Sequence, residues 1–202
     1  MIKPVAAETI DTKILTAATD HVRRFGLART TIVAIAADAG MSHANVYRYF
    51  PSKEALIDAV TAQWLKPIES GLRDIADGPD PADDKLERML SALQRAYRAT
   101  SADDPNLFRI FTAAVEEGRG IARKHRARVQ SEVQRVVEEG INGGLFAMRD
   151  TRRALALIFD ALHRFLHPVS VRMDVAIPAA QVEVRFGVMM RIVLRALATG
   201  RV

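Results

Sequence analysis

The sequence predicts an all-α protein in which a small N-terminal three-helix domain of the helix-turn-helix kind precedes a larger helical domain. Almost every long segment of the 202 residues repeats apolar side chains at the three- and four-residue spacing of an amphipathic helix. Runs of β-branched residues are short, and glycines, prolines and capping residues divide the chain into lengths typical of helices. We expect the two domains to span 1–53 and 54–202.

Capping residues delimit the first two helices. A helix over about 8–25 is expected to end at Gly26, because glycine readily adopts the left-handed conformation of a C-cap. The second helix begins after Thr30 or Thr31, since either hydroxyl can accept a hydrogen bond from an N–H group of the first turn.

Prolines and their neighbours mark the later helices. From Ser52 a helix runs to about Lys66, and Pro67 should kink or end it, although helical patterning resumes beyond. Asp80-Pro81 and Asp104-Pro105 each predict an N-cap followed by a proline in the first turn. The helices that follow are expected at about 81–100, 105–118, 121–141, 151–168 and 178–199.

The stretch from Thr30 to Lys53 meets the packing requirements of a helix-turn-helix. Gly40 supplies the residue that tolerates a positive φ in the turn. Ala36, four residues earlier, is small enough for the two helices to cross closely. The positions that face the first helix are apolar: Ile35, Ala39, Met41 and Val46. The stretch therefore predicts a recognition helix of the kind that enters the major groove of DNA.

The recognition helix places small and polar side chains where they can contact base edges. Ser42 is positioned to cap it, so that its first turn faces DNA. His43, Ala44 and Asn45 follow, and we assign these three residues to base recognition. An asparagine pairs well with the N6 and N7 edge of adenine, and an alanine can contact a thymine methyl group. Thr31, at the start of the second helix, completes this part of the predicted DNA-binding set.

Neighbouring residues suit the DNA backbone. Tyr47, Arg48 and Tyr49 can bond phosphates and sugars, which fix register without reading sequence. Lys53, at the start of the next helix, can hold a further phosphate together with backbone N–H groups there. Packing beneath the recognition helix is the alternative for Tyr49 and is expected for Phe50.

Charge and composition agree with a DNA-binding protein that is neither secreted nor held in a membrane. Of the 29 basic and 24 acidic residues, seven basic and four acidic lie within 1–53, so this region carries +3 of the net charge of +5. The chain has no cysteine, which excludes disulfides, thiolate metal sites and cysteine nucleophiles. No run of residues suits a membrane span or a signal peptide, so we expect a cytoplasmic protein.

A continuous pattern surrounds the helix-turn-helix. It consists of Gly26-Leu27, Thr31-Ile32, Ile35, Met41-Ser42, Ala44, Val46-Tyr47, Tyr49-Phe50, Lys53 and Leu56. With this pattern the chain resembles the TetR family of bacterial transcriptional regulators. The resemblance implies a homodimer that reads a palindromic operator in double-stranded DNA and that a small-molecule effector releases from it. It also implies a dimer interface formed by the last two long helices, about 151–168 and 178–199.

Those two helices carry wide apolar stripes. The last has Val182, Phe186, Met189, Met190, Val193 and Leu197, and the preceding one has Leu155, Ile158, Phe159, Leu162 and Phe165. Surplus apolar faces often mark obligate association, which supports the implied dimer. A wide face toward the chain's own core is the alternative.

Aromatic residues spread over the central helices could line an apolar effector cavity that has a few polar groups. The candidates are Trp64, Tyr97, Phe108, Phe111, Phe146, Phe159, Phe165 and His163. Ordinary core packing is the alternative for each of them.

Histidines and arginines of the C-terminal region need an interpretation of their own. His163 and His167 have a four-residue spacing that can hold a metal ion, and His125 could add a third nitrogen. No thiolate or carboxylate pattern completes such a site, so we expect no metal and no cofactor. A basic run interleaved with glutamates is interpreted as a solvated face: Arg119, Arg123, Lys124, Arg126, Arg128 and Arg135.

Other classes of function find less support. Adjacent glutamates such as Glu116-Glu117 and Glu138-Glu139 point about 100° apart on a helix, so neither pair converges on a substrate. The chain has no nucleophile elbow and no glycine-rich phosphate loop, and we expect no enzyme activity. The sequence leaves open an inducible repressor, an activator, or a constitutive regulator without an inducer.

Overall fold

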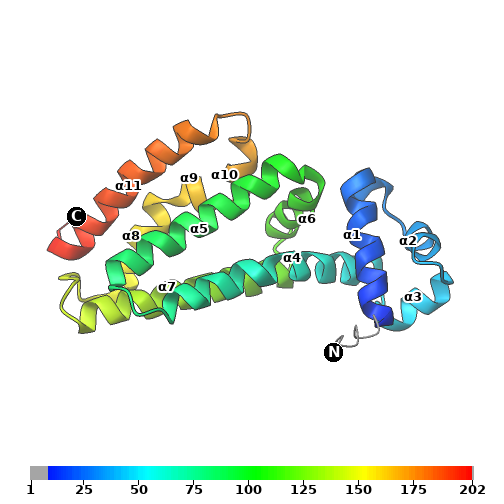
Figure 1. Ribbon diagram of the computed structural model, residues 1–202, viewed down its shortest axis with the longest axis horizontal. Helices are drawn as coiled ribbons and strands as arrows, with labels where there is room; N and C mark the ends of the chain where they lie inside the picture. The colour runs from blue at the N-terminus through cyan, green and yellow to red at the C-terminus, as the bar shows by residue number, and fades with distance from the viewer. Residues whose placement is uncertain (1–8, 202) are drawn as a thin grey trace, which may run out of the picture.

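The computed structural model describes residues 9–201, which form eleven helices and contain no strand. This confirms the predicted all-α class. Figure 1 shows an elongated molecule in which α1, α2 and α3 lie together at one end and the remaining helices form a longer bundle. We call these two parts the head (α1–α3) and the bundle (α4–α11). Within the described residues, no helix is long and apolar enough to cross a membrane.

The head consists of α1 (Ile10–Arg29), α2 (Ile32–Asp38) and α3 (His43–Tyr49). Its own helices supply an apolar core of Ile14, Ala18, Val22, Ile32, Ile35, Ala36 and Val46. The buried His21 joins α1 to α2, because its Nδ1 lies 2.8 Å from Oδ2 of Asp38. Gly26 has the expected positive φ, 73°, which breaks the helical path inside α1. The predicted start of this helix at residue 8 lies outside the described residues.

Two helices belong to both parts of the molecule: α4 (Lys53–Ala76) and α6 (Pro105–Glu116). The side chains they add to the head core are Leu56, Ile57, Val60, Leu107 and Ile110. The same helices also bury side chains in the bundle core: Leu65, Leu72, Ala76, Phe108 and Phe111. The head core therefore extends past residue 53, and α4 and α6 connect it to the bundle.

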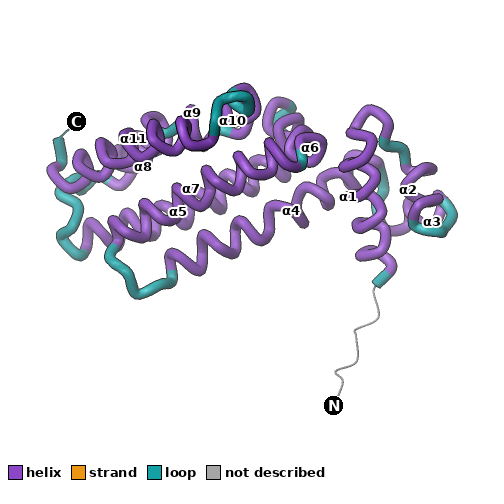
Figure 2. Tube along the Cα trace, turned by 45° about the horizontal axis from the view of Figure 1, so that its top comes forward, coloured by secondary structure: helices purple, strands orange, loops and turns teal. Residues whose placement is uncertain are grey.

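The bundle is completed by α5 (Ala82–Asp103), α7 (Gly120–Asn142), α8 (Thr151–Ala161), α9 (His163–Leu166), α10 (Pro168–Met173) and α11 (Ala179–Thr199). The helices α4, α5 and α7 pack against one another, and α11 packs on α8 and α5 (Figure 2). This arrangement surrounds a core that includes Leu86, Met89, Leu90, Val133, Val136 and Ile158.

Pro67 is predicted to kink or end the helix that contains it, and it does not end it. The helix continues through Pro67 to Ala76 instead of ending near Lys66. Leu65 and Leu72 lie on either side of the proline and are buried in the same core. Their packing holds the helix together despite the backbone hydrogen bond that Pro67 cannot make.

Proline has a larger effect at the segment 151–168, which is expected to be one helix. It is divided into α8, α9 and the start of α10. Pro168 disfavours the helical conformation at His167, whose ψ of 122° is extended. At α5, Pro81 itself is the N-cap, so this helix begins one residue later than predicted.

Candidate functional site

The turn between α2 and α3 has the geometry that the sequence predicts. Gly40 has a φ of 66°, and the N–H of Met41 donates to the carbonyl oxygen of Ala36 at 2.9 Å. Ala36, Ala39 and Val46 are at most 2% exposed. Small side chains at the crossing let α2 and α3 pack closely on each other, while α2 packs on α1, and this fixes the direction in which α3 projects.

The helix α3 turns its polar side chains outward. The Ser42 hydroxyl accepts a hydrogen bond from the N–H of Asn45 at 3.2 Å and caps the helix. Solvent-exposed residues along this segment are Ser42, His43, Ala44, Tyr47, Arg48 and Tyr49. Asn45 is half-buried, and its Nδ2 donates to Sδ of Met41 at 3.8 Å. This weak bond leaves one N–H and the carbonyl oxygen of the amide available to a base.

Lys53 and Thr31 stabilise the segments on either side of α3. The Lys53 ammonium donates to the carbonyl oxygen of Leu27 at 3.2 Å, which links the start of α4 to the end of α1. An ammonium has three donors, so this bond leaves others for a phosphate. Thr31 caps α2 by accepting from the N–H of Ala34 at 3.2 Å. Phe50 packs against the head core.

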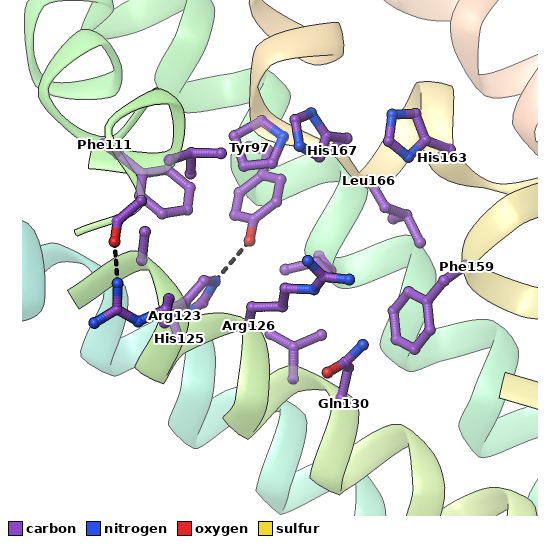
Figure 3. Close-up of a pocket in the computed structure, with 16 residues that line it drawn as sticks. Tyr97, Phe111, Arg123, His125, Arg126, Gln130, Phe159, His163, Leu166 and His167 are labelled. Carbon is purple, nitrogen blue, oxygen red and sulfur yellow. Dashed lines mark hydrogen bonds between the residues drawn. The ribbon is translucent and has the colours of Figure 1, made fainter. Parts of the chain in front are cut away.

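The bundle contains a cavity of about 370 Å³, a volume within the range of small-molecule sites. Figure 3 shows its lining. Apolar contacts come mainly from Leu93, Phe111, Val115, Ala122, Val129, Phe159 and Leu166. Polar side chains in the lining are Tyr97, Arg123, His125, Arg126, Gln130, His163 and His167. The cavity thus combines an apolar wall with a polar one.

The structure brings together four of the residues predicted for the effector: Tyr97, Phe111, Phe159 and His163 line the cavity. Trp64 and Phe108 lie outside this lining. Trp64 packs edge-on at 5.3 Å from Phe111, measured between ring centroids, and supports that ring from behind.

Two further aromatic candidates lie elsewhere in the bundle. Phe146 packs directly over Gly140 of α7, where a Cβ atom would overlap the ring. Phe165 packs edge-on against Phe186, with ring centroids 5.6 Å apart. Both rings fill space between helices, away from the cavity lining.

In the basic run interpreted as a solvated face, Arg119 is half-buried and pairs with Asp58 at 3.2 Å, whereas for Arg123 and Arg126 the interpretation is correct but incomplete. Both side chains are exposed, but they border the cavity, as does Gln130. These three residues are spaced three and four positions apart and therefore share one face of α7. The buried Val129 lies on the same side of the helix, and this periodicity is a signal by which the sequence could have identified them.

A chain of hydrogen bonds connects the cavity wall to α4. The hydroxyl of Tyr97 lies 2.6 Å from Nε2 of His125, and Nδ1 of His125 lies 2.8 Å from Oε1 of Glu69. Arg128 donates to the other oxygen of Glu69 at 2.6 Å. The chain crosses from α5 through α7 to α4.

Protonation in this chain follows from burial. Burial lowers the pKa of the His125 imidazole, which is therefore neutral near pH 7. Burial also raises the pKa of the Tyr97 hydroxyl, which keeps its proton. With Nδ1–H of His125 donated to Glu69, Nε2 accepts the proton of Tyr97.

His163 and His167 lie side by side at the cavity, with their rings stacked 4.6 Å apart. Burial, and then the nearby His163 and Arg126, lowers the pKa of His167. His125 is occupied by Tyr97 and Glu69. Across residues 9–201, no three potential ligands gather in a group that could hold a metal ion.

The helices α8 and α11 turn most of their apolar stripes into the protomer's own core. Leu162, Val182, Phe186, Val193 and Leu197 are at most 5% exposed. Leu155, Phe159 and Met189 are half-buried against the same core. This corrects the interpretation of the stripes as surplus apolar surface, because α11 covers the bundle and needs one full face to do so. On another face, α11 exposes Val184, Val188 and Ile192.

Two protein-family models match the chain. The model described as bacterial regulatory proteins, tetR family, matches residues 14–60. The model described as tetracyclin repressor-like, C-terminal domain, matches residues 82–182, which is half of the chain. The chain belongs to the TetR family. It is therefore a helix-turn-helix transcriptional regulator and not an enzyme.

Individual TetR-family proteins are similar to this regulator over different lengths. The transcriptional regulator YhgD of Bacillus subtilis is 28% identical over 166 residues, which cover 75% of this chain and 85% of YhgD. The regulator RutR of Escherichia coli K12 is 45% identical over 92 residues, covering 44% of this chain and 42% of RutR. The solved structure of RolR with resorcinol shares the fold, with a TM-score of 0.63 and 19% identity over 94% of this chain and 92% of RolR.

Proposed function

We propose that this TetR-family regulator is a homodimeric repressor that binds a palindromic operator through α3 and is released from DNA by a small organic effector. The position of α6 carries this proposal. Phe111 of α6 lines the cavity, whereas Leu107 and Ile110 of the same helix lie in the head core. A ligand that displaces α6 would therefore act on both cores.

Contacts at the first turn of α6 support this role. Nδ2 of Asn106 donates to the carbonyl oxygen of Arg23 at 3.0 Å. The guanidinium of Arg23 lies 3.2 Å from Oδ2 of Asp104. A Cβ atom on Gly26 would lie only 3.2 Å from Oδ1 of Asn106, so α1 and α6 pack closely there. Movement of α6 would shift α1 and, through it, the recognition helix.

Binding to duplexes from the region upstream of the gene tests DNA recognition. Asn45→Ala should reduce discrimination between sequences by about 1–3 kcal/mol, because it removes a base contact. Lys53→Ala should weaken binding to all duplexes alike and reduce the salt slope by about 1. Half-sites should lie about one helical turn apart, roughly 34–36 Å, or a multiple of this. Failure to form a sequence-specific complex with any duplex would reject the proposal.

We place the dimer interface on α8 and α11. The exposed side chains of Val184, Val188 and Ile192 form an apolar strip along α11, which favours association with a second copy. Ile192→Glu should convert dimer to monomer in sedimentation analysis without loss of helix content. Val33→Glu changes a similarly exposed apolar side chain of the head and should leave the dimer intact.

The direction of the response separates a repressor from the alternatives. For a repressor, the effector lowers operator affinity, and the operator lowers effector affinity by the same factor. An effector that strengthens operator binding would instead indicate an activator, and one that leaves it unchanged would indicate a constitutive regulator. We propose that the protein acts in the cytoplasm, where it would meet its DNA operator.

A further inference from the structure

The cavity gathers basic side chains and has no acidic ones in its described lining. Arg123 and Arg126 come from α7, and His163 and His167 come from α9 and the residue that follows it. Figure 3 shows Arg126 extending from α7 toward the side of the cavity where Phe159 and His163 lie. The polar wall is therefore a potential site for negative charge.

The two arginines at the cavity differ from Arg128 on the same helix. Arg128 turns away from the cavity and lies 2.6 Å from a carboxylate oxygen of Glu69. Arg123 donates to the backbone carbonyl of Gly118. Among residues 9–201, no carboxylate lies within ion-pair distance of Arg123 or Arg126. No carboxylate of the described residues therefore neutralises the charge of either arginine.

The other polar groups near the cavity do not favour a cation. Both oxygens of Glu69 are occupied, one by His125 and one by Arg128. The Tyr97 hydroxyl donates its proton to His125, and its pKa is raised, so it offers no negative charge. Arg126 is exposed at the cavity, so a neutral ligand that covered it would take its guanidinium donors out of water without giving them a partner, which is costly.

We propose that the effector is a small organic anion, with an apolar aromatic or short aliphatic body and one carboxylate or phosphate group that pairs with Arg126. This inference rests on the effector-responsive function proposed above. A guanidinium suits either group, because its planar donors match two oxygens at once. Arg123 adds positive charge, and the apolar wall of Phe111, Val129 and Phe159 takes the body of the ligand. The cavity of about 370 Å³ requires a small molecule.

Matched pairs of probes test the charge requirement. Calorimetric titration would compare phenylacetate with phenylacetamide, hexanoate with hexanamide, and phenyl phosphate with phenol. Each anion should bind at least about tenfold more tightly than its neutral counterpart, because the neutral compound cannot form the charge-assisted bond. The phenyl phosphate pair shows whether the site prefers a phosphate or a carboxylate.

Variants of α7 assign the effect to one residue. Arg126→Gln should reduce the affinity for the anions by about tenfold or more and leave the amides unchanged. Arg126→Lys should restore part of that affinity, because it keeps the charge but not the planar donors. Lys124→Gln removes an exposed charge outside the lining and should have no effect. Circular dichroism of each variant shows that it is folded.

Three results would each overturn the inference. They are equal affinity for the anions and their neutral counterparts, anion affinity that is unchanged by Arg126→Gln, and no binding of any anion. Titration with operator DNA separates it from the proposed function. Anions that bind through Arg126 without releasing DNA would leave the anion site standing and reject the inducible repressor. A neutral compound that binds in the cavity and releases DNA, when no anion does, would support the repressor and reject the anion site.

Discussion

The head and the bundle differ in where the side chains proposed to bind ligands lie. In the head they lie on the outer surface, and in the bundle they surround an internal cavity. In the head, α3 buries Val46 and turns His43 and Arg48 toward solvent. In the bundle, α5 and α7 bury Tyr97 and His125 and surround a cavity. The difference agrees with the ligand that we propose for each part. A DNA duplex is larger than the head and needs a projecting surface, whereas a small effector can be enclosed among helices.

The two parts are joined because α4 and α6 contribute to both cores. A substitution in one part therefore tests whether the other part is affected by it. Each substitution in the bundle has a matched substitution in the head as its control.

The largest effect is expected at the cavity wall. Phe111 is 1% exposed, and its ring centroid lies 5.7 Å from that of Tyr97. This part of the cavity wall therefore also belongs to the hydrophobic core. Phe111→Ala should lower the free energy of unfolding by about 3–5 kcal/mol in urea denaturation. Phe25→Ala on the head, where the ring is 44% exposed, should cost less than about 1 kcal/mol. A loss of unfolding free energy for Phe111→Ala as small as that for Phe25→Ala would show that the cavity wall is not part of the core.

A smaller effect is expected from the buried polar chain. Tyr97→Phe removes the hydroxyl that donates to Nε2 of His125 and leaves a buried acceptor without a partner. The free energy of unfolding should fall by about 1–3 kcal/mol. Tyr49→Phe changes an exposed hydroxyl of α3 and should leave stability unaltered. If Tyr97→Phe had the same free energy of unfolding as the wild type, this hydrogen bond would not contribute to stability.

Acidification should destabilise the protein below about pH 6.5, the ordinary pKa of histidine. Burial holds the pKa of His125 and His167 below this value, so the unfolded chain takes up protons that the native protein does not. Stability is then lost as the pH falls, by up to about 1.4 kcal/mol per pH unit for each group. Urea denaturation between about pH 7.5 and 5.5 measures the slope.

Two histidine variants locate this pH dependence. His167→Gln should have a shallower slope than the wild type, because one of the two groups is gone. His43→Gln changes an exposed histidine of α3 and should keep the wild-type slope. Identical slopes for all three proteins would show that His167 does not contribute.

The smallest stability effect, about 1 kcal/mol, is expected at the helix caps. Ser42 caps α3, and Asp150 caps α8 by accepting from the N–H groups of Arg152 and Arg153 at 2.9 and 3.2 Å. Ser42→Ala and Asp150→Ala should have similar costs in stability, but only Ser42→Ala should weaken operator binding. Equal loss of binding in both would show that the start of α8 is coupled to the head.

The helix-turn-helix could be predicted because its requirements lie within one short stretch. The turn at Gly40, the cap at Ser42 and the small side chain of Ala36 depend on local backbone geometry and on neighbours a few residues away. The division of α9 and α10 had a local signal too, since Pro168 disfavours helix at the residue before it, His167. At Pro67 the local signals conflicted: the proline disfavours helix, whereas the helical pattern resumes beyond it, and core packing decided that α4 continues.

The cavity is different because its parts meet only in the folded protein. Tyr97 and His125 are 28 positions apart, and His125 and Glu69 are 56. Amphipathic periodicity shows that α7 and α11 each have an apolar face, but it does not show which helix will cover that face. Sequence was thus sufficient for the helices and the outward face of α3, which follow from short-range sterics and hydrogen bonds. Tertiary packing decided that Arg126 borders a cavity and that Phe186 lies in the protomer's core, because long-range contacts determine both.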